Sequence, residues 1–209
     1  MAANGANEAL GKAHVPYGSD GSGLYSAATL GCFRVIQEAK PMILDALSEL
    51  PLKFYQGCVR IADYGTADGG TSMPLLGDLI DTIKRNHPST EVEVSYEDQP
   101  TNDFKSLFFF VQGLKAIENV EPYLKRHSGV FVTASGTGFY EQCFPSNSIH
   151  LGMSFTAMHW LRRKPCNITT GLHMTQAEGN ELAAFAKQAE EVSEAGHACT
   201  NEGALSGSS

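Results

Sequence analysis

Hydrophobic positions along the chain alternate between two spacings, which predict strands and helices in turn. Residues 58–64 are mostly apolar and end near an acid, as a buried strand does. Apolar residues then recur at helical spacing over 75–83, and the helix should end near Asn86–Pro88. Alternating residues over 91–97 predict a second strand. This order of strand, loop, helix and strand indicates a parallel sheet covered by helices.

The rest of the chain continues this pattern and then loses it. Apolar spacing over 24–50 predicts one or two helices, which Pro41 should kink or split. We expect an aromatic-rich helix over 103–114, a third strand over 129–134 and a fourth near 148–155. The predicted fold is α/β with a Rossmann-like, mostly parallel sheet. It is incomplete after about four strands, where such sheets normally have about five or more.

Composition divides the chain into three segments. Residues 1–23 are small, polar and Gly-rich, which predicts a flexible N-terminal arm. Residues 24–195 should form one partial Rossmann-like domain, whose last helix lies over 175–195. Residues 196–209 have the composition of a disordered tail.

The charge balance argues against nucleic acid and anionic membranes as partners. Among 209 residues, 15 are Lys or Arg and 23 are Asp or Glu, giving a formal net charge of −8, whereas binding to phosphate backbones needs clustered cations. No apolar run is long enough to span a membrane, and the N-terminus lacks the apolar core of a signal peptide. The five cysteines never form CxxC, and no histidines have metal-ligand spacing. We therefore expect a cytoplasmic protein without a metal site.

Candidate chemistry lies where the first two predicted strands end. The run VRIADYGTADGG contains Asp63 and a Gly-rich loop, and Asp98 follows the second strand. Ligands bind outside the carboxyl ends of parallel strands, and glycines let a ligand approach the backbone. The spacing is not GxGxxG, which argues against a dinucleotide and favours a positively charged cofactor without phosphates. Asp98 could accept the hydroxyl hydrogens of a ribose, although a solvated turn acid before a proline fits its position equally well.

Four motifs occur together in an order typical of one family. They are IADYGTADGGTS, YEDQPTNDFKSLF, GTGFYEQCFP and SFTAMHWL, and they lie within residues 24–165. In this range the chain resembles the SABATH methyltransferases, which use S-adenosylmethionine to methylate carboxylates of small acids and, in some members, ring nitrogens. The resemblance implies the Rossmann-like sheet of class I methyltransferases, S-adenosyl-L-methionine as cofactor and a small carboxylic acid as substrate.

The resemblance also implies a set of cofactor-binding residues. Asp63 and Gly65 match positions near the methionine and adenosine parts of the cofactor, and Asp98 matches the acid that holds the ribose. The family has Ser-Phe beside the adenine where this chain has Gly138 and Phe139, so a hydroxyl is lost. The implied set consists of Tyr25, Thr29, Asp63, Gly65, Asp98, Gln99, Gly138 and Phe139.

Two parts of this set depart further from the family. Gln99 stands where the family has an apolar residue beside the adenine. Upstream, LYSAAT resembles the family's SYAxNS, in which Tyr25 and Thr29 would reach the cofactor or the edge of the substrate. Here Leu24 replaces the first serine and Ala28 replaces the asparagine.

The substrate pocket resembles the family less closely. His159 and Trp160 match a pair that touches the carboxylate and ring of the substrate, although a lone Trp is by itself more often a core residue. The glutamine that helps this Trp to bind the carboxylate is Cys32 here, and a thiol is a poor hydrogen-bond donor. The implied substrate-binding residues are Tyr25, Cys32, His159 and Trp160.

Methyl transfer to a carboxylate needs no nucleophile–base pair, because the acceptor is already ionised at neutral pH. The protein's part is to align the reactants away from water, so we assign no catalytic side chain. The predicted function is methyl transfer to the carboxylate of a small organic acid. Family members are longer, and the match fades after the helix at 175–190. The alternative is a truncated, non-catalytic remnant that binds cofactor weakly or pairs with a full-length homologue through a bare strand edge, and formation of a homodimer also stays open.

Overall fold

The computed structural model describes residues 19–52, 57–157, 166–167 and 178–187. Its centre is a sheet of four strands, β1 (Cys58–Tyr64), β2 (Glu91–Glu97), β3 (Val130–Ser135) and β4 (Leu151–Ser154). All neighbouring strands in the order β3-β2-β1-β4 pair in parallel. The predicted α/β class and parallel sheet are therefore confirmed: β1 and β2 match their predicted ranges, β3 is shifted by one residue, and β4 is shorter than the predicted 148–155.

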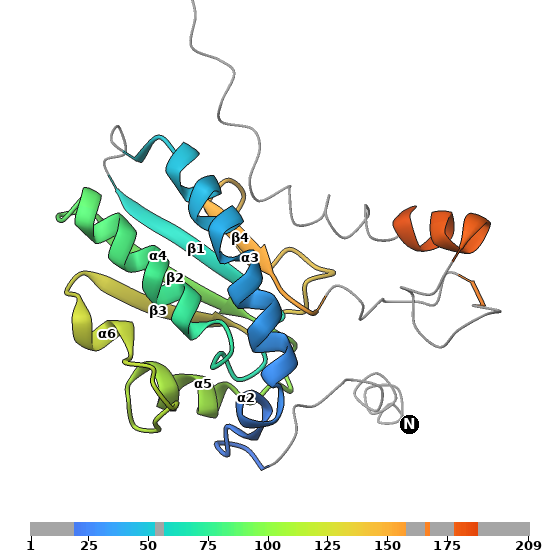
Figure 1. The fold of residues 1–209 in the computed structure, drawn as a ribbon, viewed down its shortest axis with the longest axis horizontal. Coiled ribbons are helices and arrows are strands. Elements are labelled where there is room, and N and C mark those ends of the chain that lie inside the picture. Colours follow the sequence, from blue (N-terminus) through green and yellow to red (C-terminus); the bar gives the residue numbers. More distant parts are fainter. Residues whose placement is uncertain (1–18, 53–56, 158–165, 168–177, 188–209) are drawn as a thin grey trace, which may run out of the picture.

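The helices pack mainly in front of the sheet in the view of Figure 1. They are α2 (Leu24–Ala28), α3 (Leu30–Glu49), α4 (Met73–Asn86), α5 (Phe104–Val111) and α6 (Tyr123–Arg126), and residues 179–187 are also helical. Pro41 lies inside α3 and does not split it. The break falls instead at Thr29, whose φ of −112° and ψ of 50° separate α2 from α3.

The hydrophobic core lies between one face of the sheet and the helices. Alternate residues of the two central strands point to this face and are fully buried against α4, among them Val59, Ile61 and Val94. Because successive side chains of a strand point to opposite faces, the residues between them lie on the other side. There Arg60 Nε and Glu93 Oε2 form an ion pair at 3.0 Å. Burial of one face and charge on the other explain why the residues of β2 alternate.

Parts of the predicted domain division lie outside the described residues, namely 1–18, most of 175–195 and the tail at 196–209. Residues 19–23, which composition assigns to the arm, are described and contact the start of α5. The Gly21 N–H donates to Asp103 Oδ1 at 2.8 Å, and the Gly23 N–H donates to Ser106 Oγ at 2.7 Å. The division into arm, domain and tail stays a prediction.

Replacing Leu79 tests the core described above. Its side chain is 0% exposed, so Leu79→Ala removes apolar contacts and leaves a cavity. We expect the free energy of unfolding, measured in urea, to fall by about 2–5 kcal/mol. Leu114→Ala is the matched control, because Leu114 is 74% exposed and should change stability little. Equal losses in the two variants would contradict this assignment of the core.

Candidate functional site

The loop between β1 and α4 needs glycine at positions where other parts of the chain come close. Gly65 has a φ of +71°, and a Cβ built on it would lie 2.3 Å from the Cβ of Ala157. A Cβ on Gly70 would lie 2.3 Å from Ser26 Oγ. Glycine therefore lets the loop pass between α2 and the residues that follow β4. This close approach explains why the junction is rich in glycine.

Asp63, the acid near the end of β1, is buried and fastens this loop. Its Oδ2 accepts hydrogen bonds from Thr66 Oγ1 at 2.9 Å and from Ser72 Oγ at 2.6 Å. Burial raises the pKa of Asp63 to about 6, although the bonds from Ser72 and Thr66 act in the opposite direction. The negative charge of Asp98 adds to the rise. Asp63 is therefore mainly ionised at neutral pH.

Asp98 follows β2 and reaches the same loop. Its Oδ2 accepts the Ala67 N–H at 2.7 Å, and its Oδ1 accepts the Gln99 N–H at 2.8 Å. Because Asp63 binds Thr66 and Asp98 binds Ala67, the two carboxylates meet consecutive residues of one loop. They lie at the same edge of the sheet, where the sequence places them, while their roles toward a cofactor stay a prediction.

Glu97 is a third acid at this edge, and the sequence analysis did not single it out. Its side chain is 0% exposed; Oε2 accepts the Gly65 N–H at 3.2 Å, whereas Oε1 is buried without a hydrogen-bond partner. Burial raises its pKa to about 8, and the charges of Asp98 and Asp63 contribute to the rise. Glu97 is therefore mainly protonated at neutral pH. In the sequence, the signal that could have identified Glu97 was its position as an acid at the end of a predicted strand.

The helix α2 closes over the loop from the N-terminal side. The Ser26 N–H donates to Asp68 Oδ2 at 3.0 Å, and the Ser26 hydroxyl donates to Asp68 Oδ1. Tyr25 lies beside Cys32, and burial raises the Tyr25 pKa to about 12, with Cys32, Asp68 and Asp98 contributing. The structure thus brings Tyr25 and Cys32 to the predicted site. It also adds Asp68, which is fully buried and was not among the predicted site residues.

Three further predicted residues, Thr29, Phe139 and Gly138, differ in what surrounds them. The Thr29 hydroxyl donates to the Tyr25 carbonyl at 2.7 Å, so it is engaged at the end of α2. Phe139 lies near the loop, because a Cβ on Gly65 would be 3.6 Å from Phe139 Cε1. A Cβ built on Gly138 would meet no atom of the described residues within 4 Å, so among them the position of the lost hydroxyl is open space.

His159 and Trp160 lie outside the described residues, so their proposed contact with a substrate stays a prediction. Within the described part of the chain, no cluster of three or more His, Cys, Asp or Glu side chains is suited to hold a metal ion. No helix in that part has the length and apolarity to cross a bilayer.

The site occupies a characteristic place in the sheet. The chain runs from β1 outward to β2 and β3 and then returns to place β4 on the other side of β1. Strand order therefore reverses at β1, and ligands of open α/β sheets bind at the carboxyl ends of the strands beside such a switch point. The fold and the loop define an α/β protein with a candidate ligand site at this position.

Comparison with known proteins gives the particular family. A family model described as SAM dependent carboxyl methyltransferase matches residues 15–195. The chain belongs to this family, which confirms the resemblance seen in its motifs.

Individual relatives agree with this assignment. Salicylate/benzoate carboxyl methyltransferase of Arabidopsis thaliana is 31% identical over 154 residues, covering 71% of this chain and 40% of the relative. Loganic acid O-methyltransferase of Catharanthus roseus is 28% identical over 171 residues, covering 75% and 42%. A solved structure of loganic acid methyltransferase with SAH has a TM-score of 0.63 and 25% identity, covering 86% of this chain and 52% of that chain. The chain spans less than half the length of either curated relative.

Substituting alanine at two glycines tests the geometry of the loop. Gly65→Ala places a side chain at positive φ and against Ala157, so the free energy of unfolding should fall by at least about 1 kcal/mol. Gly138→Ala is the matched control, because its new methyl group meets open space. Thermal unfolding of both variants checks the prediction. If Gly65→Ala is as stable as Gly138→Ala, the described path of the loop is wrong.

The raised pKa of Glu97 predicts a pH-dependent stability. Its folded pKa of about 8 exceeds the ordinary value of 4.5, so the folded state holds the proton more tightly and stability falls as pH rises between these values. Above pH 6.5 neither Asp63, with a pKa of about 6, nor His150, with a pKa lowered from 6.5, changes this slope much. We expect a loss of about 1.5 kcal/mol between pH 6.5 and 8, measured by urea unfolding.

The variant Glu97→Gln isolates this effect, because an amide oxygen can still accept the Gly65 N–H but does not titrate. Its stability should change little over the same range of pH. Glu118→Gln, at an exposed position, should keep the slope of the unmodified chain. An unchanged slope in Glu97→Gln would show that another group releases the proton.

Proposed function

We propose that the chain forms the cofactor-binding part of an enzyme that transfers a methyl group to the carboxylate of a small organic acid. The observation that carries the proposal is the joint attachment of Asp63 and Asp98 to one Gly-rich loop at the switch point of the sheet. Membership of the SAM dependent carboxyl methyltransferase family supports the identity of the cofactor.

The residues present suit a nucleoside that carries a positive charge. Asp98 accepts two backbone N–H groups, which fixes its carboxylate beside the loop, and a carboxylate is a suitable acceptor for ribose hydroxyls. The ionised Asp63 and Asp98 create a negative potential that favours a positively charged ligand. The ring of Phe139, which lies near the same loop, offers an apolar surface for the adenine.

When bound, S-adenosyl-L-methionine supplies a methyl group on a positively charged sulfur. A carboxylate oxygen of the acceptor would take this methyl group as the carbon–sulfur bond breaks, with the bonding electron pair left on sulfur. Such a transfer would move no proton, so we assign no general base to this site. The chain's part is to orient both reactants and to exclude water.

On the acceptor side, Tyr25 and Cys32 are the described residues that we assign to the substrate, and His159 and Trp160 complete the proposed pocket. The Tyr25 phenol is protonated at neutral pH, and a phenol can donate a hydrogen bond to a carboxylate. The relatives are named for salicylate and benzoate, jasmonate and loganic acid, which makes a small carboxylic acid the proposed substrate class. The Rossmann-like description of the domain and a cytoplasmic location are also part of this proposal.

A second candidate function follows from one feature of the sheet. Among the described strands, β4 pairs with β1 alone, so its other edge carries backbone groups that a further strand could bind. A partner strand could come from a second copy of this chain or from a longer homologue. In this second candidate function the chain binds the cofactor but does not catalyse methyl transfer. Turnover of an acid therefore distinguishes the two candidate functions.

Replacing Asp98 tests the proposed cofactor site. Asp98→Ala removes a charged acceptor of two hydrogen bonds, and we expect the affinity for S-adenosylhomocysteine, measured by calorimetric titration, to fall at least about tenfold. Asp45→Ala, at an exposed position of α3, is the matched control and should leave the affinity unchanged. Equal affinities of the two variants would exclude Asp98 from the site. Turnover of a panel of small acids by the unmodified chain then separates the enzyme from the non-catalytic alternative.

A further inference from the structure

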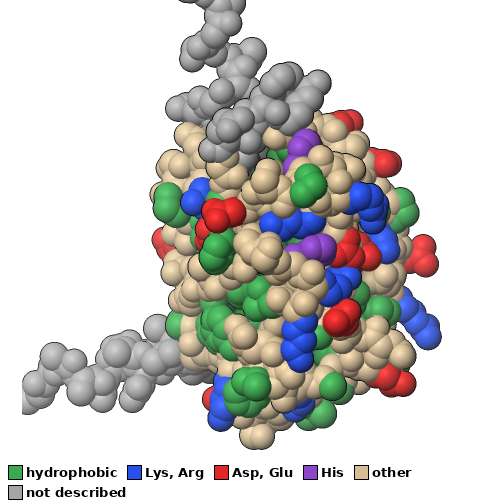
Figure 2. Space-filling view, turned by 90° about the vertical axis from the view of Figure 1, so that its left-hand side faces the viewer, with side chains coloured by type: hydrophobic (Ala, Val, Ile, Leu, Met, Phe, Trp, Pro, Cys, Tyr) green, Lys and Arg blue, Asp and Glu red, His purple; other side chains and the backbone are tan. Residues whose placement is uncertain are grey.

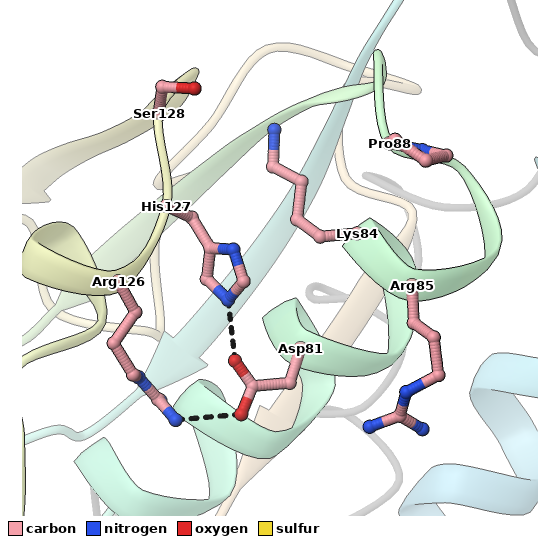
Figure 3. A pocket seen from close by; sticks show the side chains of 7 residues that line it. All are labelled: Asp81, Lys84, Arg85, Pro88, Arg126, His127 and Ser128. Atoms are coloured by element: carbon pink, nitrogen blue, oxygen red, sulfur yellow. Dashed lines mark hydrogen bonds and ion pairs between the residues drawn. The ribbon is translucent and has the colours of Figure 1, made fainter.

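A second hollow lies at the opposite end of the sheet from the candidate cofactor site. Its volume is about 490 Å³, and we call it the basic pocket because its charged lining consists of Lys84, Arg85, Arg126 and His127 around Asp81 (Figure 3). Asp81, Lys84 and Arg85 come from the last turns of α4, whereas Arg126 ends α6 and His127 follows it. Both segments precede strands, so the basic pocket lies at the amino ends of β2 and β3.

Positive charge exceeds negative charge in this pocket. Lys84, Arg85 and Arg126 are cations at neutral pH, and Asp81 is the only acid among the described residues that line the pocket. This excess contrasts with the formal net charge of −8 of the chain. Figure 2, which looks at this end of the molecule, shows Lys and Arg side chains near a histidine and an acid. The excess of cations is therefore a local feature and does not reflect the overall composition.

Asp81 holds two of these side chains in place. Arg126 Nη1 lies 2.7 Å from Asp81 Oδ2, and His127 Nε2 lies 2.6 Å from Asp81 Oδ1. A Cβ built on Gly77 would lie 2.1 Å from Arg126 Nη2, so the guanidinium packs directly over the backbone of α4. One N–H of Arg126 serves Asp81, and a guanidinium has five, so donors remain for a ligand.

Lys84 is held in place from the other side. Its Nζ donates to the Thr90 carbonyl at 2.7 Å and to the Gly129 carbonyl at 3.3 Å, which joins the segments that precede β2 and β3. An ammonium group has three N–H donors, so one remains for an incoming acceptor. Arg85 is exposed at the rim. Fixing Lys84 and Arg126 before a ligand arrives lowers the entropic cost of binding it.

We propose that the basic pocket binds the phosphate group of a small phosphate monoester. A phosphate group presents several strong acceptor oxygens, and the planar donor fork of arginine matches their geometry. The volume of the pocket lies in the range of small-molecule sites, about 300–1,000 Å³. A nucleic acid is disfavoured, because the net charge of −8 would repel an extended polyanion.

Calorimetric titration of the 209-residue chain with inorganic phosphate and with glycerol 3-phosphate tests the proposal. We expect saturable binding of both at constant ionic strength and none of glycerol. Arg85→Gln should weaken the binding about threefold, the effect of losing one partly exposed charge pair. Arg34→Gln is the matched control, because Arg34 is exposed on α3 outside the pocket, and it should leave the affinity unchanged.

A second variant separates geometry from charge. Gly77→Ala displaces the Arg126 guanidinium without removing a charge, and it should weaken phosphate binding while circular dichroism shows a folded chain. The proposal is overturned if the unmodified chain shows no saturable binding of either probe. It is equally overturned if Arg34→Gln and Arg85→Gln lose the same affinity, or if duplex DNA binds more tightly than glycerol 3-phosphate. The variants Arg85→Gln and Gly77→Ala should still bind S-adenosylhomocysteine. Failure of the phosphate proposal is therefore distinguishable from failure of the proposed function.

Discussion

The candidate site depends on the attachment of the loop after β1 to the end of β2. The N–H groups of Gly65 and Thr66 both donate to the Glu97 carbonyl, at 2.9 and 3.0 Å, and the next N–H, of Ala67, donates to the Asp98 carboxylate. Asn102 completes the attachment, because its Nδ2 donates to the Ala67 carbonyl at 2.6 Å. Polar groups of a buried loop must find partners, and here most of them come from one neighbouring strand end.

This attachment concentrates acids at one edge of the sheet. The strands that hold the loop also bring Asp63, Glu97 and Asp98 together, and three nearby carboxyl groups cannot all ionise without cost. Protonation of Glu97 reduces that repulsion and leaves the two acids that a positively charged cofactor would meet. At the other end of the same strands the charge is reversed, because Lys84 and Arg126 are fixed by carbonyls and by Asp81. One small sheet thus presents two ends of opposite charge.

The fold could largely be predicted from the sequence because its signals are local. The periods of apolar residues located β1, β2 and β3 to within one residue and placed β4 inside its predicted range, since strand alternation and helical spacing are set by backbone geometry. The break between α2 and α3 was expected at Pro41 and lies at Thr29. The sequence is less informative about this break, because α2 is held against the loop by the contact between Ser26 and Asp68. These two residues are far apart in the chain, so no local pattern predicts their contact.

For the site, the sequence by itself determined which residues stand at the carboxyl ends of the first two strands, and with them Asp63, Gly65 and Asp98, because position in a parallel strand fixes the edge at which a residue lies. It did not reveal the buried, protonated Glu97 or the pairing of Asp81 with His127. Those features arise only when segments distant in sequence are packed together. Burial and neighbouring charge are properties of that packing, and so the tertiary structure alone decided them.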